Sequence, residues 1–272
     1  MSLNKPIWKL KDWININKLD FNNLCENPNA INLIKKNKNN INWYSLSKNE
    51  NAIEILEKNQ DNINWGLLSK NENAIHLIKK KLDKINWSLL SYNSNAIEIL
   101  KQNPNKIDWF RLCLNKNAIE LLNKNKNNIN WYSLSKNENA IEILKQNPNK
   151  IFWAALCCNP NGIDLIKKNL DKINWYYLSL NPNAIEILEQ NPDKIDWFYL
   201  SLNPNAINLL EKNQDKIDWY NLSLNPSIFE LDYKAMRIAN QKIEEELIKE
   251  VMKPSRVFKD PNFDYIEELF GD

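Results

Sequence analysis

An all-α solenoid of about ten two-helix repeats is the fold predicted for this chain of 272 residues, on three observations. A tryptophan recurs every 22 residues, nine times from Trp43 to Trp219, and one period before Trp43 lies Phe21. Apolar residues within each period follow helical spacing. Hydrophobic residues make up 43% of the chain, enough for a continuous core. A fixed period of this size is typical of proteins whose units pack only on their neighbours, so ten copies are expected over residues 19–230.

The first helix of each repeat is predicted to begin at the aromatic residue. In the copy at residues 41–62, Asn42 precedes Trp43 and can accept hydrogen bonds from the free N–H groups of the first turn. Most other copies repeat this cap, with Asn64, Asn86, Asp108, Asn130, Asn174, Asp196 and Asp218. Trp43, Leu46 and Ser47 then share one face of a helix of about two turns.

An asparagine follows the aromatic residue by six positions in all ten copies: Asn27, Asn49, Asn71, Asn93, Asn115, Asn137, Asn159, Asn181, Asn203 and Asn225. The chain has only three glycines, and asparagine is the residue that most readily replaces glycine in the left-handed conformation. We therefore expect these asparagines to end the first helix with a positive φ.

The second helix is predicted to begin two residues later, at an asparagine such as Asn51. Glu54, three residues on, would complete a capping box with asparagine in place of serine or threonine. The helix ends at another asparagine, as at Asn59, Asn103 and Asn191. Helices this short are unstable alone, so stacking must stabilise them. With 8–10 Å between packed helices, ten repeats would form a rod or arc roughly 80–100 Å long.

The ends of the chain differ from the repeats. Residues 1–18 contain Trp8 and Trp13, and we expect them to cap the first exposed core face. The period fails after Pro226, and residues 231–272 are assigned to a C-terminal capping helix and an acidic tail. That helix is predicted over about residues 229–252, with an apolar face of Met236, Ile243, Leu247 and Val251.

Residues that enzymes and metal sites require are scarce. The single histidine, His76, falls on the polar side of a second helix, and we expect no Ser/His/Asp, Cys/His or multi-histidine site. Cys25, Cys113 and Cys157 stand where other copies carry serine, and Cys158 follows at a more exposed position. The three are interpreted as small buried residues, not as a disulfide framework or a zinc site. We expect no catalytic, cofactor-binding or metal-binding residues, and a protein that is not an enzyme.

Positions that vary between copies indicate a binding surface. One, two and five residues after the aromatic residue, the first copy is polar, with Asn22, Asn23 and Glu26. Late copies are apolar there and would stack into an aromatic stripe of Tyr176, Tyr177, Leu180, Phe198, Tyr199, Leu202, Tyr220 and Leu224. Large exposed apolar patches usually mark interfaces, so these eight residues are the predicted partner-binding site. Alternatively, the C-terminal helix or the next copy's helix covers the stripe.

Charge is distributed unevenly along the chain. Residues 1–150 carry 23 Lys and Arg against 14 Asp and Glu, whereas residues 151–272 carry 13 against 20. Lysines such as Lys35, Lys36 and Lys79 lie near the ends of second helices, where a positive charge is favoured electrostatically. They could also contact phosphates while first-helix aromatics stack on bases, as in repeat proteins that read RNA. Head-to-tail association of the basic and acidic ends into filaments is a third alternative.

No apolar run approaches 18 residues, and residues 1–11 lack the apolar stretch of a signal peptide. We therefore expect a soluble, intracellular protein with no membrane partner.

The repeat resembles a known group of proteins. The segments INWYSLSKNENAIEIL at residues 41–56 and LSLNPNAINLL at residues 200–210 are similar to short Trp/Asn helical repeats in uncharacterised proteins of giant DNA viruses of amoebae, mimivirus-like viruses in particular. The 50 asparagines agree with the A/T-rich genomes of these viruses. The resemblance covers residues 19–259. It implies a viral origin and a place in the host cytoplasm or the virion, but no activity.

Residues 36–56 are identical to residues 124–144, which indicates a block duplication with little later divergence. Copies this similar are not expected to recognise ten distinct ligand features. A non-catalytic protein–protein interaction scaffold with a host or viral partner is therefore the predicted function. Nucleic-acid binding through the basic N-terminal half, and a self-associating filament or virion component, are the alternatives.

Overall fold

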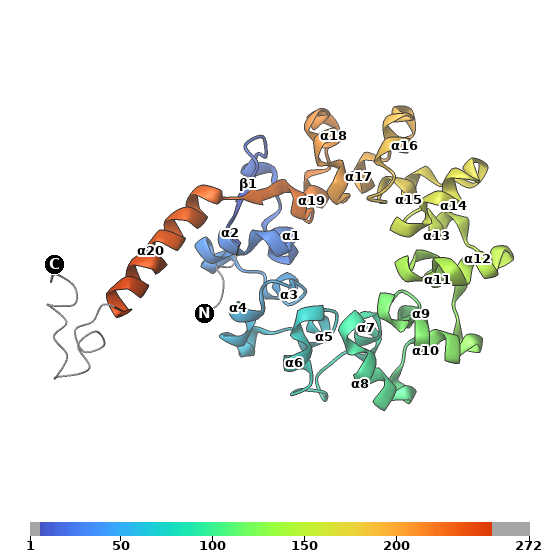
Figure 1. Ribbon diagram of the computed structural model, residues 1–272, viewed down its shortest axis with the longest axis horizontal. Helices are drawn as coiled ribbons and strands as arrows, with labels where there is room; N and C mark the ends of the chain where they lie inside the picture. Colours follow the sequence, from blue (N-terminus) through green and yellow to red (C-terminus); the bar gives the residue numbers. More distant parts are fainter. Residues whose placement is uncertain (1–5, 252–272) are drawn as a thin grey trace, which may run out of the picture. The chain divides into compact units, whose positions relative to one another are not determined.

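A computed structural model describes residues 6–251 and confirms an all-α repeat fold (Figure 1). The chain divides into two units, Leu10–Phe229 and the pair of terminal segments Met1–Lys9 and Glu230–Asp272. The first unit holds all ten copies. Each begins with a short helix at its aromatic residue: α1 Phe21–Glu26, α3 Trp43–Leu46, α5 Trp65–Leu68, α7 Trp87–Tyr92, α9 Trp109–Leu112, α11 Trp131–Lys136, α13 Trp153–Leu156, α15 Trp175–Ser179, α17 Trp197–Leu200 and α19 Trp219–Leu222.

Nine copies continue into a second helix: α2 Ile31–Lys36, α4 Ile53–Glu57, α6 Ile75–Ile78, α8 Ile97–Gln102, α10 Ile119–Lys124, α12 Ile141–Gln146, α14 Ile163–Lys167, α16 Ile185–Glu189 and α18 Ile207–Glu211. Eight copies have a 3₁₀ turn shortly after the first helix: η2 Pro28–Ala30, η5 Glu72–Ala74, η6 Ser94–Ala96, η8 Lys116–Ala118, η10 Glu138–Ala140, η12 Pro160–Gly162, η15 Pro204–Ala206 and η17 Pro226–Ile228. Further 3₁₀ turns lie before the first copy and after second helices: η1 Ile16–Lys18, η3 Lys38–Asn40, η4 Gln60–Asn62, η7 Pro104–Lys106, η9 Lys126–Asn128, η11 Pro148–Lys150, η13 Leu170–Lys172, η14 Pro192–Lys194 and η16 Gln214–Lys216.

The predicted caps of the first helices are confirmed. Asn42 Oδ1 accepts a hydrogen bond from the Ser45 backbone N–H at 3.1 Å, and the Asn or Asp residues of eight other copies do the same. Phe152 occupies this position in the seventh copy and provides no side-chain cap. The predicted end of a second helix is confirmed at Asn103, which is the C-cap of α8 and is followed by Pro104 at the start of η7. At the other two predicted ends, Asn59 and Asn191, the C-cap lies one residue earlier, at Lys58 and Gln190.

The prediction of left-handed asparagines is wrong. Among residues 6–251 no residue has a positive φ, and the backbone of Asn93 is extended, because its side chain bonds to the preceding copy. Asn93 Nδ2 donates to the carbonyls of Ser69 and Asn71 at 3.0 and 2.9 Å, while its Oδ1 accepts from the Asn95 N–H at 2.9 Å. In all ten copies the side chain of the equivalent asparagine donates to two backbone carbonyls of the adjoining copy. Each of these ten asparagines is 0 or 1% exposed.

The second asparagine also differs from its predicted role. The N-cap of α4 is Ala52, so Asn51 does not cap that helix and the capping box with Glu54 is absent. Asn51 Nδ2 instead donates to the Pro28 carbonyl of the preceding copy at 3.0 Å. Both asparagines therefore connect neighbouring copies, and we call the two rows of hydrogen bonds the asparagine ladder.

A third row of hydrogen bonds explains the buried serines and cysteines. Ser47 Oγ donates to the Trp43 carbonyl at 2.7 Å and accepts from the Asn64 backbone N–H of the next copy at 3.0 Å. Cys113 and Cys157 replace the serine with a sulfur that accepts from the equivalent N–H at 3.3 Å. Because sulfur and hydroxyl both fit the buried site and both accept, the prediction of small structural cysteines is confirmed.

The first copy packs on the tenth, so the solenoid of Leu10–Phe229 closes into a ring (Figure 1). Asn27 Nδ2 donates to the carbonyls of Ser223 and Asn225, both at 3.0 Å, and the Asp20 N–H donates to Ser223 Oγ at 2.8 Å. Lys18 Nζ lies 4.9 Å from the Trp219 ring centroid, just as Lys150, three residues before Trp153, lies 4.8 Å from that of Trp131. The closing junction thus repeats the internal ones.

Closure follows from the wedge shape of the repeat. First helices line the inner side of the ring and second helices the outer side (Figure 1). The 3₁₀ turns between them pack against one another from copy to copy, including η17 against η2, whereas grooves separate successive second helices at α2–α4 and at α14–α16. A leucine from each first helix and a leucine or isoleucine from each second helix are fully buried between the two layers, as Leu46 and Leu56 illustrate.

Ring closure overturns three expectations. The predicted rod or arc of roughly 80–100 Å is wrong, because stacking distance alone ignores the curvature of each copy. The first core face, which residues 1–18 were predicted to cap, packs against the tenth copy. Head-to-tail contact occurs within one chain, so the filament alternative has lost the free ends that it requires.

The tenth copy has no second helix. Strand β2 (Phe229–Leu231) follows η17 and pairs with β1 (Trp8–Leu10). The Lys11 N–H donates to the Ile228 carbonyl and the Asp232 N–H to the Ile7 carbonyl, which makes the pairing antiparallel. Helix α20 (Tyr233–Val251) begins at Tyr233 rather than at residue 229, because the strand uses the first residues of the predicted helix. The predicted acidic tail lies outside the described residues.

Candidate functional site

The aromatic stripe lies on the first helices, as predicted. Tyr176, Phe198 and Tyr220 follow the tryptophans of α15, α17 and α19 and are 44, 49 and 59% exposed. Next-copy helices therefore leave these rings accessible. The other predicted residues, Tyr177, Leu180, Tyr199, Leu202 and Leu224, are half-buried on the same helices or directly after them. The structure thus brings the eight residues onto consecutive copies of one surface.

Tyrosine contacts join the copies within the stripe. The hydroxyls of Tyr176 and Tyr199 are hydrogen-bonded, and their ring centroids are 4.0 Å apart. Tyr176 also meets Tyr177 edge-on at 5.2 Å, and Phe198 meets Tyr199 at 5.1 Å. These contacts hold the rings in fixed orientations, which lowers the entropy cost of binding a partner.

The hydrogen bond with Tyr176 raises the pKa of Tyr199 to about 12. A Tyr176→Phe variant is expected to return this pKa toward the usual value near 10, because the partner hydroxyl is removed. A raised pKa in the folded protein means that the contribution of this contact to stability is complete below about pH 10 and is lost between about pH 10 and 12. Ultraviolet titration of wild type and variant measures the shift. An unchanged titration curve would show that the hydrogen bond does not form in solution.

The aromatic surface extends further than predicted. Tyr132 meets Phe152 edge-on with centroids 5.9 Å apart, and a hydrogen bond with Tyr132 raises the pKa of Tyr177 two copies away. Lys136 Nζ lies 4.6 Å from the Tyr132 ring centroid and 5.2 Å from that of Tyr177. The predicted stripe did not include Tyr132, Lys136 and Phe152, because only the late copies were predicted to be apolar at the outward positions. A comparison of residues two copies apart would have found them.

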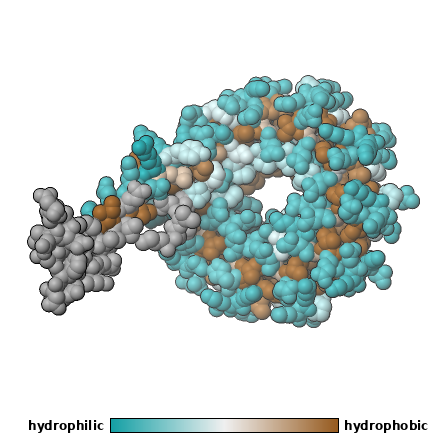
Figure 2. Space-filling view, in the orientation of Figure 1, coloured by the Kyte–Doolittle hydropathy of each residue, from teal (hydrophilic) through white to brown (hydrophobic). Residues whose placement is uncertain are grey.

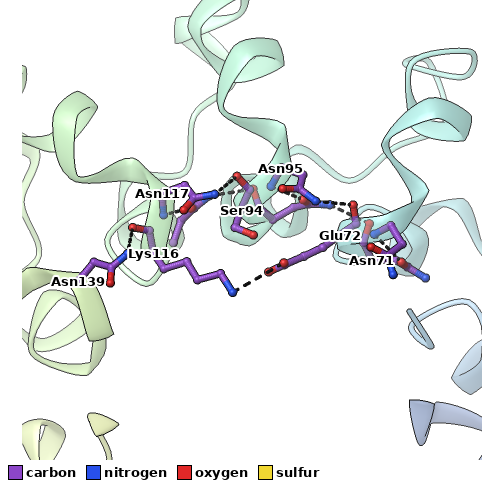
Figure 3. Close-up of polar contacts among 10 residues, drawn as sticks. Asn71, Glu72, Ser94, Asn95, Lys116, Asn117 and Asn139 are labelled. Atoms are coloured by element: carbon purple, nitrogen blue, oxygen red, sulfur yellow. Dashed lines mark hydrogen bonds and ion pairs between the residues drawn. The ribbon is translucent and has the colours of Figure 1, made fainter. Parts of the chain in front are cut away.

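The ring surrounds an opening, visible in Figure 2. The residues five and seven positions after the aromatic residue come at or just after the ends of the first helices, which line the inner side of the ring (Figure 1), and we call these residues the inner edge. Eight of them line a groove of about 220 Å³: Glu72, Tyr92, Ser94, Leu114, Lys116, Lys136, Glu138 and Pro160. Lys116 Nζ reaches past Ser94 to the Glu72 carboxylate at 3.9 Å (Figure 3). Figure 3 also shows the asparagine ladder behind this ion pair.

The inner edge has two chemically different arcs. Early copies carry both signs of charge in equal number: Lys48, Lys70, Lys116 and Lys136 with Glu26, Glu50, Glu72 and Glu138. Late copies carry Leu180, Pro182, Leu202, Pro204, Leu224 and Pro226. Burial and the nearby Glu72 carboxylate raise the pKa of Glu50. An inner edge without net positive charge is a poor channel for a polyanion, and its apolar arc continues the aromatic stripe.

The cysteines and the histidine, side chains that often act in catalysis or metal binding, have structural explanations here. Burial raises the pKa of the Cys25, Cys113 and Cys157 thiols, which keeps them protonated and unreactive. His76 Nε2 contacts the Glu57 carboxylate at 2.8 Å on the exposed side of α6, where it was predicted. Among residues 6–251, no three His, Cys, Asp or Glu side chains are grouped to hold a metal ion. No helix in the same range is long and apolar enough to cross a bilayer.

Comparison with known proteins gives no further guide: no family model, curated protein or solved structure matches the chain.

Proposed function

We propose that the ring is a non-catalytic scaffold that binds a protein partner through the aromatic stripe. The exposure of Tyr176, Phe198 and Tyr220 on three consecutive copies carries this proposal. Exposed aromatic residues in a contiguous, pre-ordered patch are characteristic of interface hot spots, where tyrosine is enriched. The apolar arc of the inner edge enlarges the same surface, and its leucines and prolines offer no groups for acid–base or nucleophilic chemistry.

The likeness of the repeat to proteins of giant amoebal viruses supports a viral origin. We extend the proposal accordingly to a host or viral protein partner, met in the host cytoplasm or in the virion. Nucleic-acid binding through the basic half of the chain is a second candidate function, and capture with and without nuclease shows whether nucleic acid accounts for a recovered partner.

The test uses a variant in which Tyr176, Phe198 and Tyr220 are all replaced by asparagine. Asn22 occupies this position in the first copy, so the substitution is compatible with the repeat. We expect the ring to stay folded and the partner to be lost, with affinity reduced at least about thirtyfold, because even one hot-spot aromatic contributes roughly 2 kcal/mol or more. Affinity capture of the full chain from host-cell extract, with and without nuclease, measures this by mass spectrometry.

The matched control is Tyr44→Asn with Phe110→Asn, which removes exposed aromatics at the same repeat position outside the stripe. A partner that survives nuclease, binds the control and fails to bind the stripe variant supports the proposal. Equal recovery by both variants would contradict it, and recovery that collapses on nuclease treatment would favour nucleic acid.

A further inference from the structure

The outer wall of the ring contains a groove that differs from the aromatic stripe in place and in chemistry. It lies between α2 and α4, has a volume of about 580 Å³, and is lined by Lys35, Lys38, Ile41, Trp43, Glu54, Ile55, Lys58 and Asn59. Trp43 and the two isoleucines provide an apolar surface, and three lysines stand around it. The volume falls within the range of small-ligand sites.

The charge at this groove is positive. Lys35 and Lys58 both approach the same carboxylate, that of Glu54, at 3.7 and 3.1 Å, so one negative charge is shared between two positive ones. Lys38 adds a third. An adjoining pocket of about 430 Å³ is lined only by the residues from Lys35 to Asn40, none of which is acidic. A cationic ligand would be repelled here, whereas an anionic group would be attracted.

The duplicated copy provides an internal comparison, because Trp131 lies in the same 21-residue sequence as Trp43. At Trp131 the residues equivalent to Lys35 and Lys58 are Asn123 and Gln146. Lys150 Nζ lies over the Trp131 ring, 4.8 Å from its centroid. The residue beside Trp43 that is equivalent to Lys150 is Asn62. Two copies of one sequence are therefore placed in differently charged surroundings.

A second groove of the same kind, about 360 Å³ at Trp175, has no lysine excess. Its Lys167 is paired with Glu186 at 3.3 Å, and Leu170 and Gln190 replace the other two lysines. The groove at Trp43 is thus the one of the three sites with three lysines around its indole. The Trp131 site keeps one of these lysines, Lys126, and has Lys150 over the ring itself.

We propose that the groove at Trp43 binds single-stranded nucleic acid, with one base stacked on the indole and the adjoining phosphates on Lys35, Lys38 and Lys58. A flat apolar surface beside several cations suits a planar aromatic group joined to an anion. Aromatic side chains that stack on bases and lysines that contact phosphates are the two elements of sequence-tolerant single-strand binding, and the phosphate contacts make it salt-dependent. This site is separate from the proposed protein-binding stripe, so the two proposals are tested independently.

The test transplants residues between the duplicated copies. The variant Lys35→Asn, Lys58→Gln, Asn62→Lys gives the Trp43 groove the three residues found at Trp131, so the fold should be retained. We expect a fluorescein-labelled oligothymidine to bind the full chain about tenfold more weakly in this variant, with a shallower salt dependence, because two phosphate contacts are lost. The reciprocal variant Asn123→Lys, Gln146→Lys, Lys150→Asn should bind the same oligonucleotide more tightly than wild type.

Two further measurements test whether a base stacks in the groove and whether this site is separate from the aromatic stripe. An abasic oligonucleotide with the same number of phosphates should bind at least about fivefold more weakly, since it cannot stack. The stripe variant should bind oligothymidine as wild type does, which separates this result from the scaffold proposal. Unchanged affinity in the Trp43-groove variant, equal binding of the abasic probe, or binding of phosphatidylserine vesicles without binding of oligothymidine would each overturn the assignment.

Discussion

The ring is expected to open in a variant that combines Asn27→Ala, Asn29→Ala and Ser223→Ala. Asn27 and Asn29 together donate three hydrogen bonds to carbonyls of the tenth copy, and Ser223 accepts one from the first copy. A buried polar group left without its partner costs about 1–3 kcal/mol, so the closing junction loses several kcal/mol. Each remaining junction keeps its own ladder, so the helices should persist. Small-angle scattering should show a larger radius of gyration, with unchanged helical circular dichroism.

The opened chain has two complementary ends, and these should associate between molecules as concentration rises. The matched control is Asn71→Ala, Asn73→Ala and Ser47→Ala, which removes the same contacts at an internal junction. There the two copies remain joined by the chain itself, so the control should lose stability without a comparable increase in radius. A closing-junction variant that is less stable but equally compact and monomeric would show that apolar packing alone keeps the ring closed.

Replacing Asn137 by alanine is expected to lower the free energy of unfolding by roughly 2 kcal/mol or more, because two buried backbone carbonyls and one partly buried N–H lose a partner. Asn137 is buried, donates to the carbonyls of Cys113 and Asn115 at 2.9 and 2.8 Å, and accepts from the Asn139 N–H at 2.9 Å. Each group left without this partner costs about 1–3 kcal/mol where water cannot replace it. Urea denaturation followed by tryptophan fluorescence measures the loss.

The control substitution for Asn137→Ala is Asn127→Ala. Asn127 is exposed in the turn after α10, so its replacement should change the free energy of unfolding by no more than about 0.5 kcal/mol. Equal effects of the two substitutions would show that the ladder contributes little, and that the asparagines could be exchanged for other polar residues without loss.

Local features of the fold were predictable because their causes are local. The cap at Asn42 lies three residues from the N–H that it accepts, and the apolar spacing of Trp43 and Leu46 is a property of one helix. The cysteines at serine positions were correctly assigned to tight contacts for the same reason. The stripe residues were found because their periodic position defines a common face, whatever the path of the solenoid.

The asparagines were misinterpreted because their partners are remote in sequence. An asparagine at a helix end in a glycine-poor chain fits a left-handed cap equally well, and only the carbonyls 22 and 24 residues earlier reveal the alternative. Part of the aromatic surface was not predicted, for a similar reason. Lys136 meets Tyr177 across two copies, a contact that no single repeat contains.

The amino-acid sequence by itself thus determined the period, the two short helices, the caps of the first helices, the buried faces and the position of the aromatic stripe, because these depend on neighbours within a few residues. Only the tertiary structure decided that the asparagines join copies and that the ring closes. A small rotation at each junction has no sequence signature of its own, yet it accumulates over ten copies until Asn27 meets Ser223, 196 residues away.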